Sequence, residues 1–235
     1  MNNDLFYFAF GIPIESDSEF KKKRCVHKAY LDLCRTLRYK EEQKNSEEKD
    51  HFINDVETQI LEEIKSYPSE LKDTCNMDYL QNDFDIWHWS LTQKLQNILE
   101  KYKDIFVDSK TLTVGQAQKW INMTIKYMIL MGIEDIAKIP KKDIHIPLDD
   151  FILTAAEVNE DISILDSFTV KGLGIKKRSF KNISPWSGID EYETYMNYQN
   201  AVREKCNNKA PIEWERKAWI AEATRRSIEN KQEDE

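Results

Sequence analysis

The sequence predicts a mainly α-helical protein in which residues 1–235 form a single multi-helix domain. Glycine and proline are scarce, with 6 of each in 235 residues, whereas all-β folds use many of both in their turns. Apolar residues recur at helical spacing, and 6 Trp, 10 Tyr and 10 Phe supply a large core. The charge-rich stretch 41–50 is a weak internal boundary. β-branched residues and two glycines predict a small extended or hairpin excursion near 160–185.

The first half of the chain is expected to form three amphipathic helices. Their apolar positions repeat at helical spacing over 20–40, 51–67 and 83–106. The segment Ser16 to Glu19 supplies N-cap candidates for the first helix, and Pro68 ends the second.

The third of these helices contains a short aromatic run. Trp87, His88 and Trp89 are consecutive. Two indoles beside an imidazole could form a stacking platform for a ligand. Aromatic clusters on helices more often pack in the core, so core packing is our interpretation and stacking is the alternative.

The segment 113–132, TVGQAQKWINMTIKYMILMG, is expected to be the central helix of the fold. Apolar residues surround most of its helical wheel, which is typical of a buried helix. Thr113 is its N-cap candidate, and Gly132 stands in the C-cap position. A polar stripe follows one face at intervals of three and four residues, through Gln116, Lys119, Asn122 and Lys126. Polar residues on the most buried helix are the most informative feature of the sequence.

A second apolar segment, IHIPLDDFIL, follows and is interrupted by Asp149 and Asp150. After the extended excursion, two further helices are expected over 189–206 and 210–230, the last of them opened near Pro211. Acidic residues alternate with tryptophans on this last helix, and we expect them to brace the fold rather than to act as acids. These residues are Glu213 and Glu215.

The charge, cysteine and histidine patterns limit the classes of function. A net charge of −8 argues against a surface that coats nucleic acid or anionic membranes, although Lys171 to Lys181 is a local basic run without an acid. The 4 cysteines and 4 histidines are scattered, so we expect reduced thiols, no metal site and no cofactor. Neither a signal peptide nor a membrane span is recognisable, which favours a cytoplasmic protein without a membrane partner. Nothing in the sequence indicates an oligomeric state.

The order of the central segments resembles that of the helix-hairpin-helix DNA glycosylases. In that family a glycine-containing hairpin precedes a helix with a lysine, and a segment with an aspartate follows shortly afterwards. Here TVGQAQKW stands at the position of the hairpin helix and HIPLDDFIL at that of the aspartate segment. The likeness covers about 40 residues, with one glycine where the family usually has two. It implies a DNA partner, Lys119 as the nucleophile and Asp149 as the catalytic aspartate.

The chemistry implied by the resemblance gives roles to further residues. A desolvated lysine can attack an anomeric carbon, while a carboxylate deprotonates it or stabilises the oxocarbenium-like sugar. A flipped base needs a pocket with stacking side chains. We therefore expect Trp120, Asn122 and Lys126 to line the site. A loop at GLGIKK would hold phosphates through Lys176, Lys177 and Arg178.

Two other interpretations stay open. Lys119 and Asp149 could form a buried structural ion pair, and the polar stripe could face a partner. The protein would then be a non-enzymatic helical binding protein, such as a regulatory or phage–host conflict protein that recognises a protein or small ligand. The first hypothesis is a base-excising enzyme, a hydrolase that acts on nucleic acid in DNA repair or phage defence.

Overall fold

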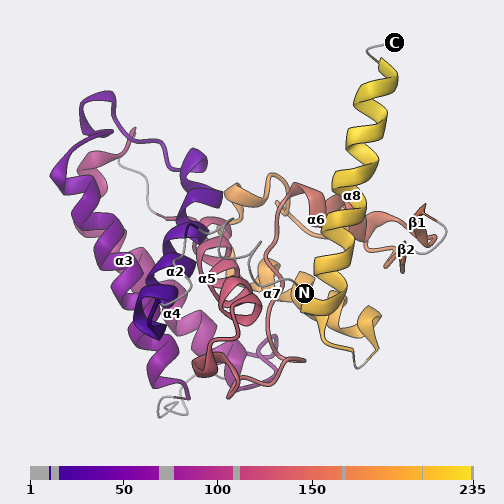
Figure 1. Cartoon of the computed structure of the whole chain (residues 1–235), viewed down its shortest axis with the longest axis horizontal. Coiled ribbons are helices and arrows are strands. Elements are labelled where there is room, and N and C mark those ends of the chain that lie inside the picture. The colour runs from indigo at the N-terminus through magenta and orange to yellow at the C-terminus, as the bar shows by residue number, and fades with distance from the viewer. Residues whose placement is uncertain are drawn as a thin grey trace.

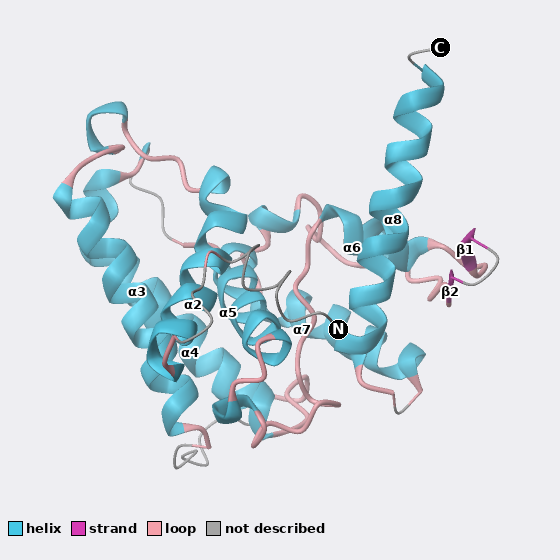
Figure 2. Cartoon of the chain, viewed as in Figure 1, coloured by secondary structure: helices cyan, strands magenta, loops and turns pink. Residues whose placement is uncertain are grey.

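The computed structural model describes residue 11 and residues 16–68, 77–107, 112–165, 168–207 and 209–233. These residues contain seven α-helices, α2 to α8, and one antiparallel hairpin of β1 (Ile162–Leu165) and β2 (Phe168–Val170). The prediction of a mainly α fold with a small hairpin inside 160–185 is confirmed, as Figure 2 shows. Among the described residues, no helix combines the length and the apolar character that a membrane span requires.

The first half of the chain forms one layer of helices around the central helix α5 (Figure 1). This layer consists of α2 (Ser18–Leu33), α3 (Glu47–Ser66) and α4 (Asp83–Lys101). Each begins at a polar cap, because Asp17, Ser46 and Asn82 accept hydrogen bonds from backbone N–H groups of the first turn. The charge-rich stretch 41–50 contains a 3-10 turn, Glu41–Gln43, and the first turn of α3.

Helix α5 (Val114–Leu130) is the buried centre of the fold, as predicted. Thirteen of its 17 residues are buried, and a capping box joins Thr113 and Gln116 at its start. Gly132 follows the helix with φ +66°, the left-handed conformation that ends a helix. Both predicted caps are confirmed.

Gly115 lies inside the first turn of α5 and not in a hairpin, because the capping box already begins the helix at Val114. A Cβ atom on Gly115 would stand 1.8 Å from the carbonyl oxygen of Trp186, so only glycine fits against this backbone. The Gly115 N–H donates to the carbonyl of Ile189 at 2.9 Å. Gly115 therefore fixes the turn Trp186–Gly188 on the start of α5.

The second half of the chain packs on the other side of α5. It contains α6 (Asp150–Glu157), α7 (Tyr192–Cys206), α8 (Pro211–Glu233) and the β1–β2 hairpin. Figure 1 shows α6 and the hairpin beside α8, while the C-terminal part of α8 extends beyond the body of the molecule. The two halves have separate hydrophobic clusters, and α5 contributes residues to both.

Candidate functional site

A cavity of about 570 Å³ lies where α5 meets α2, the start of α6, the Trp186 turn and α8. Its lining combines four cations, three carboxylates and four aromatic rings with two apolar side chains. These residues are Lys28, Leu31, Asp32, Arg35, Lys119, Met123, Lys126, Tyr127, Asp149, Asp150, Phe151, Trp186 and Trp219. The volume falls within the range of small-molecule sites, roughly 300–1,000 Å³.

Lys119 and Asp149 meet in the wall of this cavity. Their Nζ and Oδ2 atoms lie 2.6 Å apart, although the residues are 30 positions apart in the chain. The lysine projects from α5, and the aspartate is the N-cap of α6, where its other oxygen accepts from Ile152 N–H at 2.9 Å. The side chains are 6% and 14% exposed, so the pair is largely desolvated and still borders the cavity. Lys119 and Asp149, the two residues named from the resemblance in segment order, are therefore in contact in the structure.

Aromatic rings surround this ion pair. The Lys119 Nζ lies 5.8 Å from the centre of the Trp186 ring, an arrangement that Gly115 makes possible by admitting the Trp186 turn. Phe151 and Trp219 stack on each other at 5.2 Å between ring centres. Trp219 is 39% exposed, which leaves an aromatic surface open at the cavity.

A second lysine–carboxylate pair lies nearly two helical turns further along α5. Lys126 Nζ bonds Glu215 Oε1 of α8 at 2.7 Å, and Glu215 is only 1% exposed. Its second oxygen, Oε2, has no hydrogen-bond partner among the described residues. Burial raises the pKa of the Glu215 carboxyl, and the charge of Lys126 opposes that shift. Glu215 is therefore an incompletely satisfied buried acid beside the cavity.

The ion pair between Glu215 and Lys126 agrees with the expectation that the acids of the last helix brace the fold, but the sequence analysis did not predict that Glu215 lies next to a cavity-lining lysine. A signal was present in the helical spacing. Glu215 follows Pro211 by four residues and precedes Ala218 by three, so it lies on the face that carries the buried Ala218. A carboxylate on a buried face needs a partner or a function.

The opposite wall carries a third charged group. Lys28 Nζ lies 2.5 Å from Asp32 Oδ1, and the Tyr127 hydroxyl donates a short hydrogen bond to the other oxygen of Asp32. Burial, and then the bond to Asp32, raise the pKa of Tyr127. The cavity therefore presents cations and acids in alternation rather than charges of one sign.

The structure places Trp120 and Asn122 away from this cavity, in contrast to what the sequence analysis expected. Trp120 is fully buried, and its indole N–H donates to the Val26 carbonyl at 3.1 Å. Positions 119 and 126 differ by seven residues, nearly two full turns, and so face the same way. Asn122 is rotated by about 60° from that direction and points into the second half of the protein. The polar stripe of α5 therefore faces two different regions of the protein. Of the three residues expected to line the site with Lys119, Lys126 is the one that lines the cavity.

The basic residues Lys176, Lys177 and Arg178 lie in the loop after β2 and in the turn Lys177–Ser179. Lys177 Nζ lies 3.5 Å from Oε2 of Glu157, the last residue of α6. Asp149 caps the opposite end of this helix. The eight residues of α6 span about 12 Å. The structure does not bring this basic run into the cavity wall.

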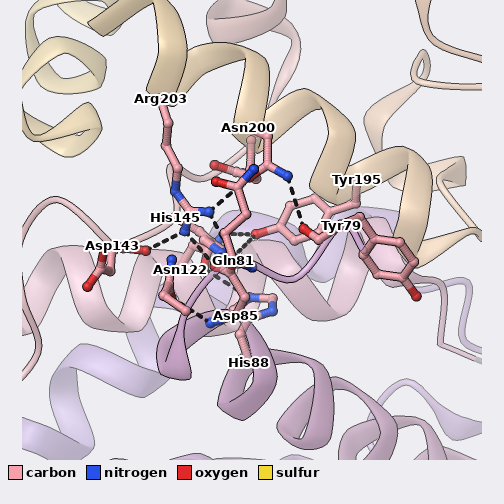
Figure 3. Close-up of polar contacts among 12 residues, drawn as sticks. Tyr79, Gln81, Asp85, His88, Asn122, Asp143, His145, Tyr195, Asn200 and Arg203 are labelled. Atoms are coloured by element: carbon pink, nitrogen blue, oxygen red, sulfur yellow. Dashed lines mark hydrogen bonds and ion pairs between the residues drawn. The ribbon is translucent and has the colours of Figure 1, made fainter. Parts of the chain in front are cut away.

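Asn122 belongs to a separate polar network, the centre of which is fully buried (Figure 3). Its side-chain oxygen lies 3.1 Å from His88 Nε2, and its amide donates to the Tyr195 hydroxyl at 2.9 Å. The Tyr195 oxygen lies 2.8 Å from His145 Nδ1, and His145 Nε2 lies 2.8 Å from Asp85 Oδ1. The interpretation of Trp87 and His88 as core residues is confirmed, since both are at most 1% exposed.

An arginine completes the network at its acidic end. Both terminal nitrogens of Arg203 donate to Asp85, at 3.0 and 2.5 Å. Burial raises the pKa of the Asp85 carboxyl, but the bonds from His145 and Arg203 outweigh burial and hold that pKa below its usual value. Burial lowers the pKa of His145 to about 4 and that of His88 well below its usual value. Both histidines are therefore neutral at pH 7, and their hydrogen bonds stabilise the fold.

The described residues contain no group of three His, Cys, Asp or Glu side chains arranged to hold a metal ion. Searches against models of protein families, against characterised proteins and against solved structures found no match to this chain.

Proposed function

We propose that this protein cleaves the N-glycosidic bond of a nucleotide in nucleic acid, with Lys119 and Asp149 as its catalytic residues. The observation that carries the proposal is the lysine–carboxylate pair, 2.6 Å apart, in the wall of a cavity lined by aromatic rings. A cavity of about 570 Å³ accommodates a nucleobase with its sugar.

The aromatic lining supports a base as the group that enters. Bases that leave the stack are held between aromatic side chains, and each such stacking contact is worth about 1–3 kcal/mol. Trp186, Phe151 and Trp219 are the rings that border the cavity near Lys119 and Asp149. Alternating charges in the wall provide donors and acceptors for the polar edge of a base.

The proposed reaction uses the ion pair directly. Asp149 accepts a proton from the Lys119 ammonium, and the resulting amine forms a bond to the C1′ atom of the sugar. The C1′–N bond breaks, the base leaves with the bonding electron pair, and the proton held by Asp149 neutralises it. Water then hydrolyses the lysine–sugar adduct and regenerates the amine.

The test is base release from single-stranded oligonucleotides that carry the normal bases, uracil, or alkylated or oxidised bases, with free base detected by mass spectrometry. Lys119→Met removes the amine. Asp149→Asn removes the carboxylate and keeps an N-cap residue for α6. We expect both variants to fold and to lose release, while Lys103→Met, on an exposed lysine of the turn after α4, keeps it. Release that is unchanged in Lys119→Met contradicts the proposal.

A second candidate function is recognition of a small ligand without chemistry. The observation that favours it is the double role of Asp149, which caps α6 and also neutralises Lys119, so that the pair contributes to the fold. This function predicts that nucleosides quench the fluorescence of Trp186 and Trp219 in the wild type although no base is released. It also predicts that Lys119→Met changes affinity or stability only.

A further inference from the structure

A second groove, also of about 570 Å³, lies between the end of β2, the end of α7 and the first turns of α8. Its lining is Thr169, Val170, Lys171, Leu173, Lys205, Cys206, Asn207, Lys209, Ala210, Glu213, Trp214, Arg216 and Lys217. We call it the basic groove, because five of these side chains are cations and one is an acid.

The cations of the basic groove are exposed. None of Lys171, Lys205, Lys209, Arg216 and Lys217 forms an ion pair within the ranges that the structure describes. The cations of the cavity and of the buried network differ from these, since Lys119, Lys126 and Arg203 each contact a carboxylate. Five unpaired cations on a protein of net charge −8 create a local positive potential that attracts an anion.

The groove walls are fixed by contacts that do not involve these charges. The Trp214 indole N–H donates to the Lys171 carbonyl at 2.9 Å and ties α8 to the end of β2. A Cβ on Gly172 would stand 2.2 Å from the Glu160 carbonyl oxygen, so the hairpin passes close to the segment after α6. An indole held at the side of a basic groove offers a face on which a base can stack.

A small cavity of about 120 Å³ lies between the basic groove and the cavity of Lys119 and Asp149. It shares Glu213 and Arg216 with the groove and Lys126 with the larger cavity. It adds another cation, Lys141. The three hollows therefore follow one another along the first half of α8 and share lining residues.

We infer that the basic groove binds the phosphodiester backbone of a single-stranded nucleic acid and leads the strand to the cavity of Lys119 and Asp149. The inference rests on the proposed function, since it names the partner that delivers the nucleotide. Cations spread over a hairpin, an interhelical turn and α8 fit a chain of phosphates better than a single anion. The net charge of −8 disfavours a broad surface for duplex DNA, whereas a single strand can bind within one basic groove.

This surface is different from the basic run at Lys176 to Arg178. Within that run Lys177 is bound to Glu157, and the run does not line the groove. Of the basic stretch noted in the sequence, Lys171 is the residue that lines the groove. Its partners come from positions 205 to 217, which no local sequence pattern connects to it.

The experiment measures the fluorescence anisotropy of a labelled oligothymidylate at about 50 and 200 mM salt, with the full-length protein. The groove variant is Lys205→Gln/Lys209→Gln/Lys217→Gln. The control variant, Lys23→Gln/Lys65→Gln/Lys101→Gln, removes the same charge from exposed lysines of α2, α3 and α4. Each phosphate contact contributes about 0.7 to the salt slope of single-strand binding, so the groove variant should lose a slope of about 2.

We expect the groove variant to bind at least about tenfold more weakly at the lower salt, and the control to stay within about twofold of the wild type. Equal affinities of groove and control variants overturn the inference, as does the absence of wild-type binding at low salt. Tighter binding of a duplex of the same length overturns the single-strand assignment.

Failure of the inference and failure of the proposed function are distinguishable with Lys119→Met, because this variant removes no groove cation. If base release depends on Lys119 while the groove variant binds normally, the groove inference is wrong and the proposed function stands. If the groove variant alone loses binding and no protein releases base, the groove inference stands and the proposed function is wrong.

Discussion

Two polar clusters in this protein differ in their access to open space, although each leaves one buried atom without a hydrogen-bond partner among the described residues, Arg203 Nε in one and Glu215 Oε2 in the other. In the buried network, both ring nitrogens of His88 and of His145 have partners within 3.1 Å, and Arg203 doubly contacts Asp85. Around the cavity, Glu215 leaves one oxygen without a partner among the described residues, and Lys119 and Asp149 border open space. The centre of the first cluster is buried, whereas Lys119 and Asp149 of the second line a cavity that can admit a ligand.

The comparison shows why titratable residues alone do not identify a site. The network contains the more perturbed pKa values, those of Asp85, His88 and His145, yet these three side chains are fully buried. Strong pKa shifts also arise in structural networks, so access to a cavity decides between the two roles. Of these two clusters, that of Lys119 and Asp149 meets the condition.

The largest expected effect is that of Asp85→Asn. The substitution leaves Arg203 without its buried counterion, and breaking such a pair costs about 3–5 kcal/mol. Urea unfolding should show this loss in the free energy of unfolding. The matched variant Asp149→Asn should cost much less, because water in the cavity can solvate Lys119. Equal losses of unfolding free energy in the two variants would contradict the distinction between the buried network and the cluster that borders the cavity.

Acid should destabilise the protein through the same network. The pKa of His145 is about 4 in the fold and near 6.5 when unfolded, so between these values the unfolded state binds more protons. Stability is therefore fully present above about pH 6.5 and falls as the pH drops toward 4, by up to about 1.4 kcal/mol per pH unit for this histidine. His88 acts in the same sense. Thermal unfolding at pH 7, 6 and 5 checks this, with His145→Gln as the variant in which the dependence weakens.

Gly115→Ala connects the fold to the cavity. A Cβ at this position meets the Trp186 carbonyl oxygen at 1.8 Å, and such overpacking costs typically about 1–3 kcal/mol. The displaced Trp186 ring should also weaken nucleoside binding near Lys119. The control is Gly188→Ala in the turn Trp186–Gly188 that packs on Gly115. The new Cβ atom would lie 3.7 Å from Pro185 Cγ, an ordinary van der Waals distance. Chemical denaturation and tryptophan quenching together separate the two consequences.

The smallest expected effect on stability is that of the ion pair itself. Lys119→Met and Asp149→Asn should each change the free energy of unfolding by less than about 2 kcal/mol, and the double variant should recover part of the loss. A double-mutant cycle measures this coupling. Losses of about 3–5 kcal/mol in both single variants, without effect on any activity, would favour the structural ion pair.

The sequence predicted the features that depend on neighbours along one helix. The burial of α5 and the caps at Thr113 and Gly132 follow from periodicity and from cap chemistry, and the structure confirms them. The approach of Lys119 to Asp149 was expected from segment order in a resembling family, not from physics. Trp120 and Asn122 were expected beside them because a one-dimensional stripe does not show where a helix face divides.

Other parts of the site depend on contacts between distant segments. Trp186 reaches Lys119 only because Gly115 admits a backbone from 71 positions later. The basic groove assembles Lys171 with residues of two helices, and Glu215 meets Lys126 across 89 positions. No periodicity in a single sequence carries this information, because it arises from how α8 packs on the rest of the fold.

The most direct test of the catalytic role of Lys119 is borohydride trapping on a single-stranded oligonucleotide with an abasic site. The Lys119 amine condenses with the C1′ aldehyde and releases water, and borohydride reduces the resulting imine to a stable amine. We expect a cross-link that peptide mapping places on Lys119 and that disappears in Lys119→Met but persists in Lys103→Met. A cross-link that survives in Lys119→Met, or none in the wild type, would contradict the assignment of Lys119 as the nucleophile.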